Sequence, residues 1–189
     1  VRQVRSLSNK RTQERLVNHL TREEMKAVLD APDPGTRNGV RDQAMLYLGF
    51  AAGLRVSELV GLRLDDVELD GPYPSMLVRG KARKQRRLPL WKAAARALRA
   101  WLAVRGAVAT PEVFLNAHGE ALTTSGFTYI VHSHVRAATL QCPSLSKKHV
   151  SPHVLRHTCA MTTLQATRDI RKVALWLGHS SLKSTEIYL

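Results

Sequence analysis

The carboxy-terminal stretch, residues 151–188, constrains this chain most, because it combines helical apolar spacing with reactive polar side chains. His153 and Arg156 are three residues apart, so a helix places them on neighbouring turns. Gly178 is suited to end a second helix, and His179 follows it directly. Polar groups that point inward among so many apolar residues need partners. An anionic substrate would be a fitting partner for them.

The charge of the chain points in the same direction. Its 189 residues carry a formal net charge of +14, which favours a polyanionic partner such as nucleic acid, although a merely basic soluble protein is the alternative. No run approaches the roughly 18 apolar residues of a membrane span, and the first residues do not resemble a signal peptide. Cys142 and Cys159 are too few for a disulfide framework, so a reducing cytoplasmic setting is expected.

Two regions are predicted along the chain. Residues 1–20 are basic and lack an apolar period, which indicates either an arm linking to a further amino-terminal DNA-binding domain or a disordered solubilising tail. Residues 21–189 form one domain. Thr21 and Glu24 have the spacing of a capping box, which predicts a helix to about Asp30. Further helices are expected over residues 38–52, 91–104 and 124–138, with strands over 76–78, 86–90 and 113–115.

Arg55 is expected at the entrance of a short helix, where a cation opposes the helix dipole. The position makes sense if Arg55 and the helix terminus bind one phosphate together, although an exposed surface arginine is the simpler reading. Glu58 follows one turn later and can hold the guanidinium of Arg55 in place.

The predicted hairpin is strongly basic. It contains six cations and no acidic residue between residues 79 and 87. Like charges this dense repel each other, so a phosphate backbone is an attractive partner, and a solvated charged hairpin is the alternative. The six residues are Arg79, Lys81, Arg83, Lys84, Arg86 and Arg87.

A metal site is disfavoured. His153 and His157 have i, i+4 spacing, but the glutamate of a zinc-binding HExxH is missing and Arg156 between them repels a cation. His132 and His134 are two apart and face different ways on a helix. No phosphate-binding P-loop or dinucleotide fingerprint is present. The remaining candidates are arginines, imidazoles and the phenol of Tyr188.

These groups suit one kind of chemistry. A phenol with a pKa near 10 is only about 0.1% ionised at neutral pH, so as a nucleophile it needs a group that removes its proton. Its target needs neutralisation of negative charge, and two arginines match two non-bridging phosphate oxygens. The combination describes metal-free phosphoryl transfer through a covalent phosphotyrosine.

Four segments together closely resemble the catalytic domain of the tyrosine recombinases, the phage integrase family. They read AAGLRVSELVGLRLDDV, GKARKQRRLPL, SPHVLRHT and LGHSSLKSTEIY. The resemblance implies a mainly α fold with a small antiparallel β-sheet (α+β). It also implies an enzyme that cuts and rejoins double-stranded DNA without cofactors. The full-length protein is expected to act as a homo-oligomer, a tetramer on DNA, and a monomer is the alternative for this fragment. The expected location is the cytoplasm, in association with the nucleoid.

The resemblance also implies roles for individual residues. Arg55 and Arg156 would clamp the phosphate, His179 would hydrogen-bond to it, and Tyr188 would attack it. Lys81 would protonate the 5′-oxygen leaving group, and His153 would assist proton transfer from the tyrosine. Glu58 would support the first arginine, and His157 would brace its helix. The hairpin cations Arg79, Arg83, Lys84, Arg86 and Arg87 would contact DNA.

Some features depart from the family pattern. Ala82 replaces a common hairpin glycine, and Thr167 stands in a turn where glycine is frequent, which predicts strain there. The chain stops one residue past Tyr188, and no amino-terminal DNA-clamping domain is present, so a fragment is expected. Two alternatives stay open, a DNA-relaxing topoisomerase-like enzyme and a catalytically silent DNA-binding regulator.

Overall fold

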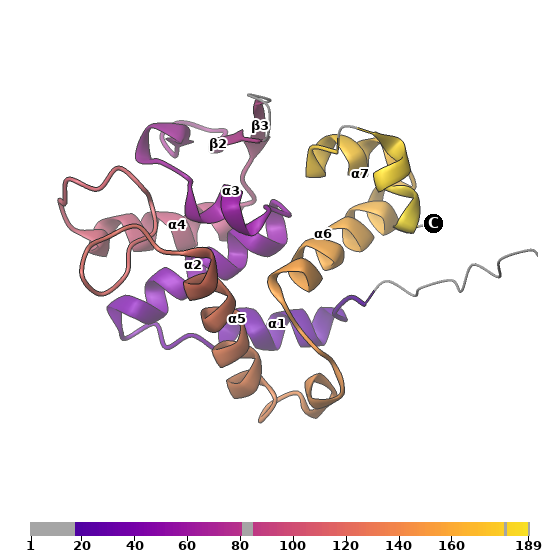
Figure 1. The fold of residues 1–189 in the computed structure, drawn as a ribbon, viewed down its shortest axis with the longest axis horizontal. Helices are drawn as coiled ribbons and strands as arrows, with labels where there is room; N and C mark the ends of the chain where they lie inside the picture. The colour runs from indigo at the N-terminus through magenta and orange to yellow at the C-terminus, as the bar shows by residue number, and fades with distance from the viewer. Residues whose placement is uncertain (1–17, 81–84, 180, 189) are drawn as a thin grey trace, which may run out of the picture.

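A computed structural model describes residues 18–80, 85–179 and 181–188. Helices dominate the fold, and the expectation of a mainly α protein with a small antiparallel sheet is confirmed (Figure 1). The α-helices are α1 (Arg22–Asp30), α2 (Arg37–Ala51), α3 (Val56–Val60), α4 (Lys92–Arg105), α5 (Thr124–Ala138), α6 (Pro152–Thr167) and α7 (Ile170–Leu177). Short 3-10 helices are η1 (Leu64–Asp66), η3 (Pro143–Lys147), η4 (Leu182–Ser184) and η5 (Glu186–Tyr188).

The sheet has three antiparallel strands in the order β1-β2-β3. They are β1 (Val67–Glu68), β2 (Ser75–Arg79) and β3 (Gln85–Pro89). Met76 pairs with Leu88 and Val78 pairs with Arg86, and directly paired residues lie on the same face of a sheet. Because Met76, Val78 and Leu88 are buried, Arg86 also faces the protein interior.

Helix α2 lies at the centre of the core, where it packs against α4 and α6. Its Met45 and Leu48 are completely buried, as is Leu98 of α4. A second, smaller apolar cluster joins α6, α7 and η5 through Cys159, Val173, Leu177 and Tyr188. The β2–β3 hairpin and α7 lie at the same end of the molecule, and the candidate site lies between them (Figure 1).

Residues 113–115 do not form the predicted strand. The Val113 carbonyl accepts hydrogen bonds from the Trp101 indole at 2.8 Å and from Nε of Arg105 at 3.1 Å, so side chains of α4 replace a strand partner. Regular pairing is limited to isolated bridges, one of which joins Leu115 to Ala121. The backbone groups of a buried segment need partners, but the partners need not belong to a strand.

The turn after α6 also differs from the prediction. Thr167 ends the helix with ordinary geometry, and the left-handed residue is Arg168, with φ of 53°. The backbone strain expected at Thr167 therefore falls one residue later. Arg168 still caps the helix, since its amide donates to the Leu164 carbonyl at 2.7 Å.

Among the described helices, none combines the length and the apolar character that crossing a bilayer requires.

Candidate phosphoryl-transfer site

The site begins where α2 ends. Gly53 has a φ of +56°, which turns the chain so that Arg55 becomes the N-cap of α3. The Arg55 amide donates to Oε2 of Glu58 at 3.0 Å, and the Arg55 guanidinium donates through Nη1 to Oε1 at 2.8 Å. The Glu58 side chain is only 4% exposed, whereas that of Arg55 is 42% exposed. One carboxylate therefore fixes the backbone and the side chain of a partly exposed arginine.

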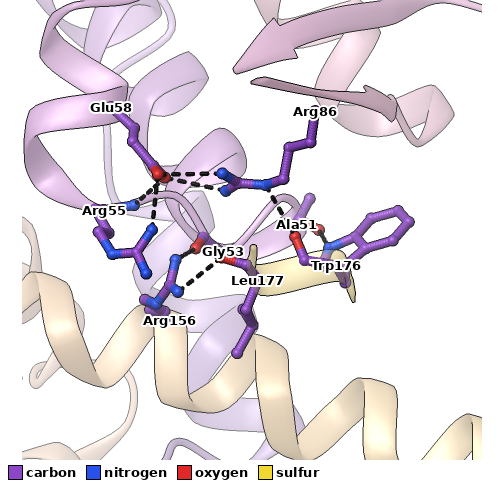
Figure 2. A network of polar contacts seen from close by, with 8 residues as sticks. All are labelled: Ala51, Gly53, Arg55, Glu58, Arg86, Arg156, Trp176 and Leu177. Carbon is purple, nitrogen blue, oxygen red and sulfur yellow. Dashed lines mark hydrogen bonds and ion pairs between the residues drawn. The ribbon is translucent and has the colours of Figure 1, made fainter. Parts of the chain in front are cut away.

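Arg156 reaches the same place from α6. Its guanidinium donates to the Gly53 carbonyl and, at 2.9 Å, to the Leu177 carbonyl, while the residue is only 5% exposed (Figure 2). Burial lowers the pKa of this guanidinium to about 10, and the nearby charge of Arg55 adds to the effect. It remains protonated at neutral pH. The structure thus brings Arg55 and Arg156 together from distant parts of the sequence.

Arg86 is a third guanidinium in this cluster, and it reaches Glu58 from β3. Its Nη1 and Nη2 donate to the two Glu58 oxygens at 3.1 and 3.0 Å (Figure 2). Burial alone would raise the pKa of the Glu58 carboxyl, but hydrogen bonds from Arg86 and Arg55 outweigh it, and the pKa is lowered. Glu58 is therefore ionised and shared by two arginines.

His179 follows the left-handed C-cap Gly178, which has a φ of +65°. Its Nδ1 lies 2.8 Å from the hydroxyl of Thr185, a completely buried residue. Burial lowers the pKa of His179 to about 4, and the charges of Arg156 and Arg55 add to this. His179 is consequently a neutral imidazole at physiological pH.

Tyr188 lies inside the smaller apolar cluster and is 5% exposed. Its hydroxyl is 2.8 Å from Nδ1 of His157, and burial raises the pKa of the phenol. The pKa of His157 is lowered by burial and then by the charge of His153. His153 itself is exposed on α6, one turn before His157. His157, which the resemblance assigns only to bracing its helix, thus makes the contact with the phenol. Its i, i+4 spacing from His153 was the sequence signal that could have indicated this.

Acidic residues outside the basic hairpin offset part of its positive charge. Lys81, Arg83 and Lys84 lie outside the described residues. Arg79 pairs with Asp66 at 2.6 Å, and Arg87 pairs with Glu68 at 2.8 Å. Their side chains remain 53% and 57% exposed, so a surface-bound polyanion can still reach both. Sequence reasoning missed these carboxylates because they come from η1 and β1, before the hairpin.

Metal ligation finds no support in this part of the molecule. Within the described residues, no group of three His, Cys, Asp or Glu side chains could hold a metal ion. His134 contacts Asp42 at 2.9 Å, whereas His132 lies near His149, with ring centroids 6.0 Å apart. The two histidines face different ways, as their spacing predicts.

The profile of the Phage integrase family matches residues 18–189, a range that includes every described residue. The chain belongs to the phage integrase family. It is 40% identical over 177 residues to tyrosine recombinase XerC of Neisseria meningitidis serogroup C, a match that covers 93% of this chain and 55% of that relative. Tyrosine recombinase XerC of Pelobacter propionicus is 36% identical over 183 residues, covering 96% of this chain and 58% of the relative.

Solved structures agree with the family assignment. The XerH site-specific recombinase in its post-cleavage complex with the palindromic difH substrate superposes with a TM-score of 0.81 at 26% identity, covering 97% of this chain and 53% of XerH. XerA recombinase superposes with a TM-score of 0.78 at 28% identity, covering 90% of this chain and 59% of XerA. The chain therefore spans just over half the length of the relatives that it matches.

Proposed function

We propose that this chain is the strand-transferring domain of a site-specific tyrosine recombinase that acts on double-stranded DNA. The observation that carries the proposal is Arg156, a guanidinium that is 5% exposed and whose hydrogen-bond acceptors are two neutral carbonyls. A buried guanidinium whose hydrogen-bond acceptors are uncharged is costly, because the nearby carboxylate of Glu58 is paired with Arg55 and Arg86 instead. Arg55 lies close enough to lower its pKa further. A phosphodiester bound between the two arginines offsets this cost.

The proposed reaction exchanges one phosphate ester for another. The Tyr188 oxygen attacks phosphorus, the bond from phosphorus to the 5′-oxygen breaks, and a 3′-phosphotyrosyl ester forms. The departing 5′-oxygen takes a proton from Lys81, a role that rests on the family resemblance. Arg55 and Arg156 neutralise the charge that develops on the non-bridging oxygens, and His179 donates to one of them. Attack by a 5′-hydroxyl reverses the steps and rejoins a strand.

The phenol must lose its proton as it attacks. Because burial raises the pKa of Tyr188, this proton needs an acceptor. The resemblance assigns proton transfer to His153, and the 2.8 Å contact supports a share for His157, whose lowered pKa keeps it neutral and able to accept. Replacing His153 and His157 by glutamine in turn identifies the proton acceptor. The variant that lacks the acceptor should cleave DNA much more slowly at neutral pH, and this defect should become smaller at high pH.

The wider assembly follows from the same proposal. Residues 1–20 would be an arm toward a further DNA-binding domain, and residues 21–189 the catalytic domain. The exposed cations Arg79 and Arg87, together with Arg83 and Lys84, would contact the DNA backbone. The full-length recombinase would act as a homo-oligomer on DNA in the cytoplasm.

Covalent capture tests the proposal. The chain is incubated with a pool of nicked duplexes that carry a randomised core, and adducts are separated on a denaturing gel. The wild-type chain should form an adduct, and Tyr188→Phe should form none while keeping its affinity for the duplexes. Tyr129→Phe is the matched control, because Tyr129 is 74% exposed on α5 and has no role in the proposed site. An adduct on Tyr188→Phe would refute the role of this tyrosine.

A further inference from the structure

We propose that Arg86 is a positioning residue that holds both ends of the phosphate site in place, and not a DNA contact as its place in the basic hairpin suggests. This inference rests on the proposed strand transfer. It starts from the register of the sheet, in which Arg86 pairs with the buried Val78 and so faces inward. The Arg86 side chain is 15% exposed, whereas that of its neighbour Arg87 is 57% exposed.

The donors of Arg86 are already occupied by the protein. Nη1 and Nη2 bind the two oxygens of Glu58, and Nε donates to the Trp176 carbonyl at 3.2 Å (Figure 2). This fork-to-carboxylate geometry gives directional strength as well as charge. Arg55 differs, since within the described residues only its Nη1 has a side-chain acceptor. Arg55 is thus available to a phosphate, and Arg86 is committed to its neighbours.

Gly178 shows how closely Arg86 fits against the end of α7. A Cβ added at Gly178 would lie 2.7 Å from Nη1 and 2.9 Å from Cζ of Arg86. The guanidinium therefore lies against the backbone of the residue directly before His179. Replacement of this glycine would displace the Arg86 guanidinium, whatever the cost of the left-handed φ.

Arg86 of β3 consequently joins two other elements of the site. Through Glu58 it fixes the guanidinium of Arg55 at the start of α3, and through the Trp176 carbonyl and Gly178 it fixes the end of α7 that carries His179. Small misplacements of groups that orient a reacting phosphate are expensive in rate. Loss of a residue that orients a metal ligand typically lowers affinity or activity by about 10- to 100-fold, and we expect a similar effect for a residue that orients a phosphate-binding arginine. Arg86→Gln should lower the rate of adduct formation by about this factor.

Two measurements on the same variant separate positioning from DNA contact. At saturating nicked duplex, Arg86→Gln should form the adduct about 10- to 100-fold more slowly, while the slope of log affinity against log salt stays that of the wild type. Arg87→Gln provides the contrast, because loss of one phosphate contact should reduce that slope by about 1. A slope reduced by about 1 in Arg86→Gln, with an unchanged rate at saturation, would overturn the inference.

Arg86→Lys is a milder variant that controls for misfolding. It keeps the positive charge but replaces the planar, bidentate guanidinium with a single ammonium. A positioning role predicts a slow variant with wild-type affinity, and wild-type rates in Arg86→Lys would contradict it. Melting temperatures add a further readout. Glu58→Gln should partly restore the stability lost in Arg86→Gln, because it removes the carboxylate left without its main partner. If the wild-type chain forms no adduct, the strand-transfer proposal fails, and the salt slope still decides whether Arg86 contacts DNA.

Discussion

Gly53 lies beside both arginines of the proposed phosphate clamp, so its replacement gives a sharp test of the site. It lies two residues before Arg55, and its carbonyl accepts a hydrogen bond from Arg156. Its φ is +56°, and a Cβ added there would lie 2.6 Å from Cδ2 of Leu177 and 3.0 Å from Sγ of Cys159. Gly53→Ala therefore introduces a backbone penalty and a steric penalty together.

The size of each penalty follows from general measurements. A non-glycine residue in the left-handed region costs about 1–2 kcal/mol. An extra methyl in a packed interior costs about 1–3 kcal/mol. Gly53→Ala should therefore lower the free energy of unfolding by about 2–5 kcal/mol. Gly71→Ala is the matched control, because Gly71 has a φ of +87° and no atom within 4 Å of the added Cβ.

Urea unfolding followed by circular dichroism measures both variants. Gly53→Ala should lose at least about 1 kcal/mol more than Gly71→Ala, which carries the backbone penalty alone. Covalent capture at a temperature where both are folded should show slower adduct formation for Gly53→Ala only, since its shifted carbonyl no longer holds Arg156. Equal losses of stability in the two variants would show that Leu177 and Cys159 yield freely and would refute the reasoning.

Three further predictions concern single contacts. The pKa of His179 in the folded protein is about 4, below its usual 6.5, so the stability that the neutral imidazole contributes is complete above about pH 6.5 and is lost as the pH falls toward 4. Urea unfolding between pH 6.5 and 4 should therefore show a smaller fall in the free energy of unfolding for His179→Asn than for the wild type. Equal falls in the two proteins would contradict the lowered pKa. Tyr188→Phe should cost about 0.5–1.5 kcal/mol through the lost His157 contact, and the same change in a His157→Asn background should cost less, whereas strictly additive losses would exclude the pair. Lys148→Met should destabilise the protein by about 1–3 kcal/mol, because Glu24 is 2% exposed and loses a partner at 2.6 Å. This loss of stability should shrink once the pH falls below the lowered pKa of Glu24, because the carboxyl is then protonated. A loss that is the same at every pH would argue against the ion pair.

The helix ends were predictable because their signals are local. Thr21 and Glu24 form the expected capping box, with hydrogen bonds of 2.8 and 3.2 Å. Gly178 takes the left-handed C-cap, and Asp169 caps the start of α7. Each of these depends on residues within one turn of the terminus, so the sequence specifies them without knowledge of the packing.

The polar partners were less predictable because they are distant in sequence. Asp66, Glu58 and Glu68 neutralise hairpin arginines from segments that precede β2. The direction of one arginine was nevertheless available from alternation, since Arg86 is two residues before the apolar Leu88 and so shares its face. Counting the positive charges along the hairpin does not reveal this direction, because the count does not separate inward-facing cations from outward-facing ones.

The charge of the assembled site matches the proposed reaction better than it matches the substrate alone. Among the described residues, the guanidiniums of Arg55, Arg86 and Arg156 and the carboxylate of Glu58 give a net charge of 3 − 1 = +2. His179 adds none, because its pKa is about 4. A phosphodiester carries a single negative charge, and the transition state of the attack carries more on its non-bridging oxygens. An excess of fixed positive charge therefore stabilises the transition state more than the bound substrate, which is the condition for catalysis. Arg156 is essential to this balance, since its carbonyl acceptors hold the guanidinium without neutralising it.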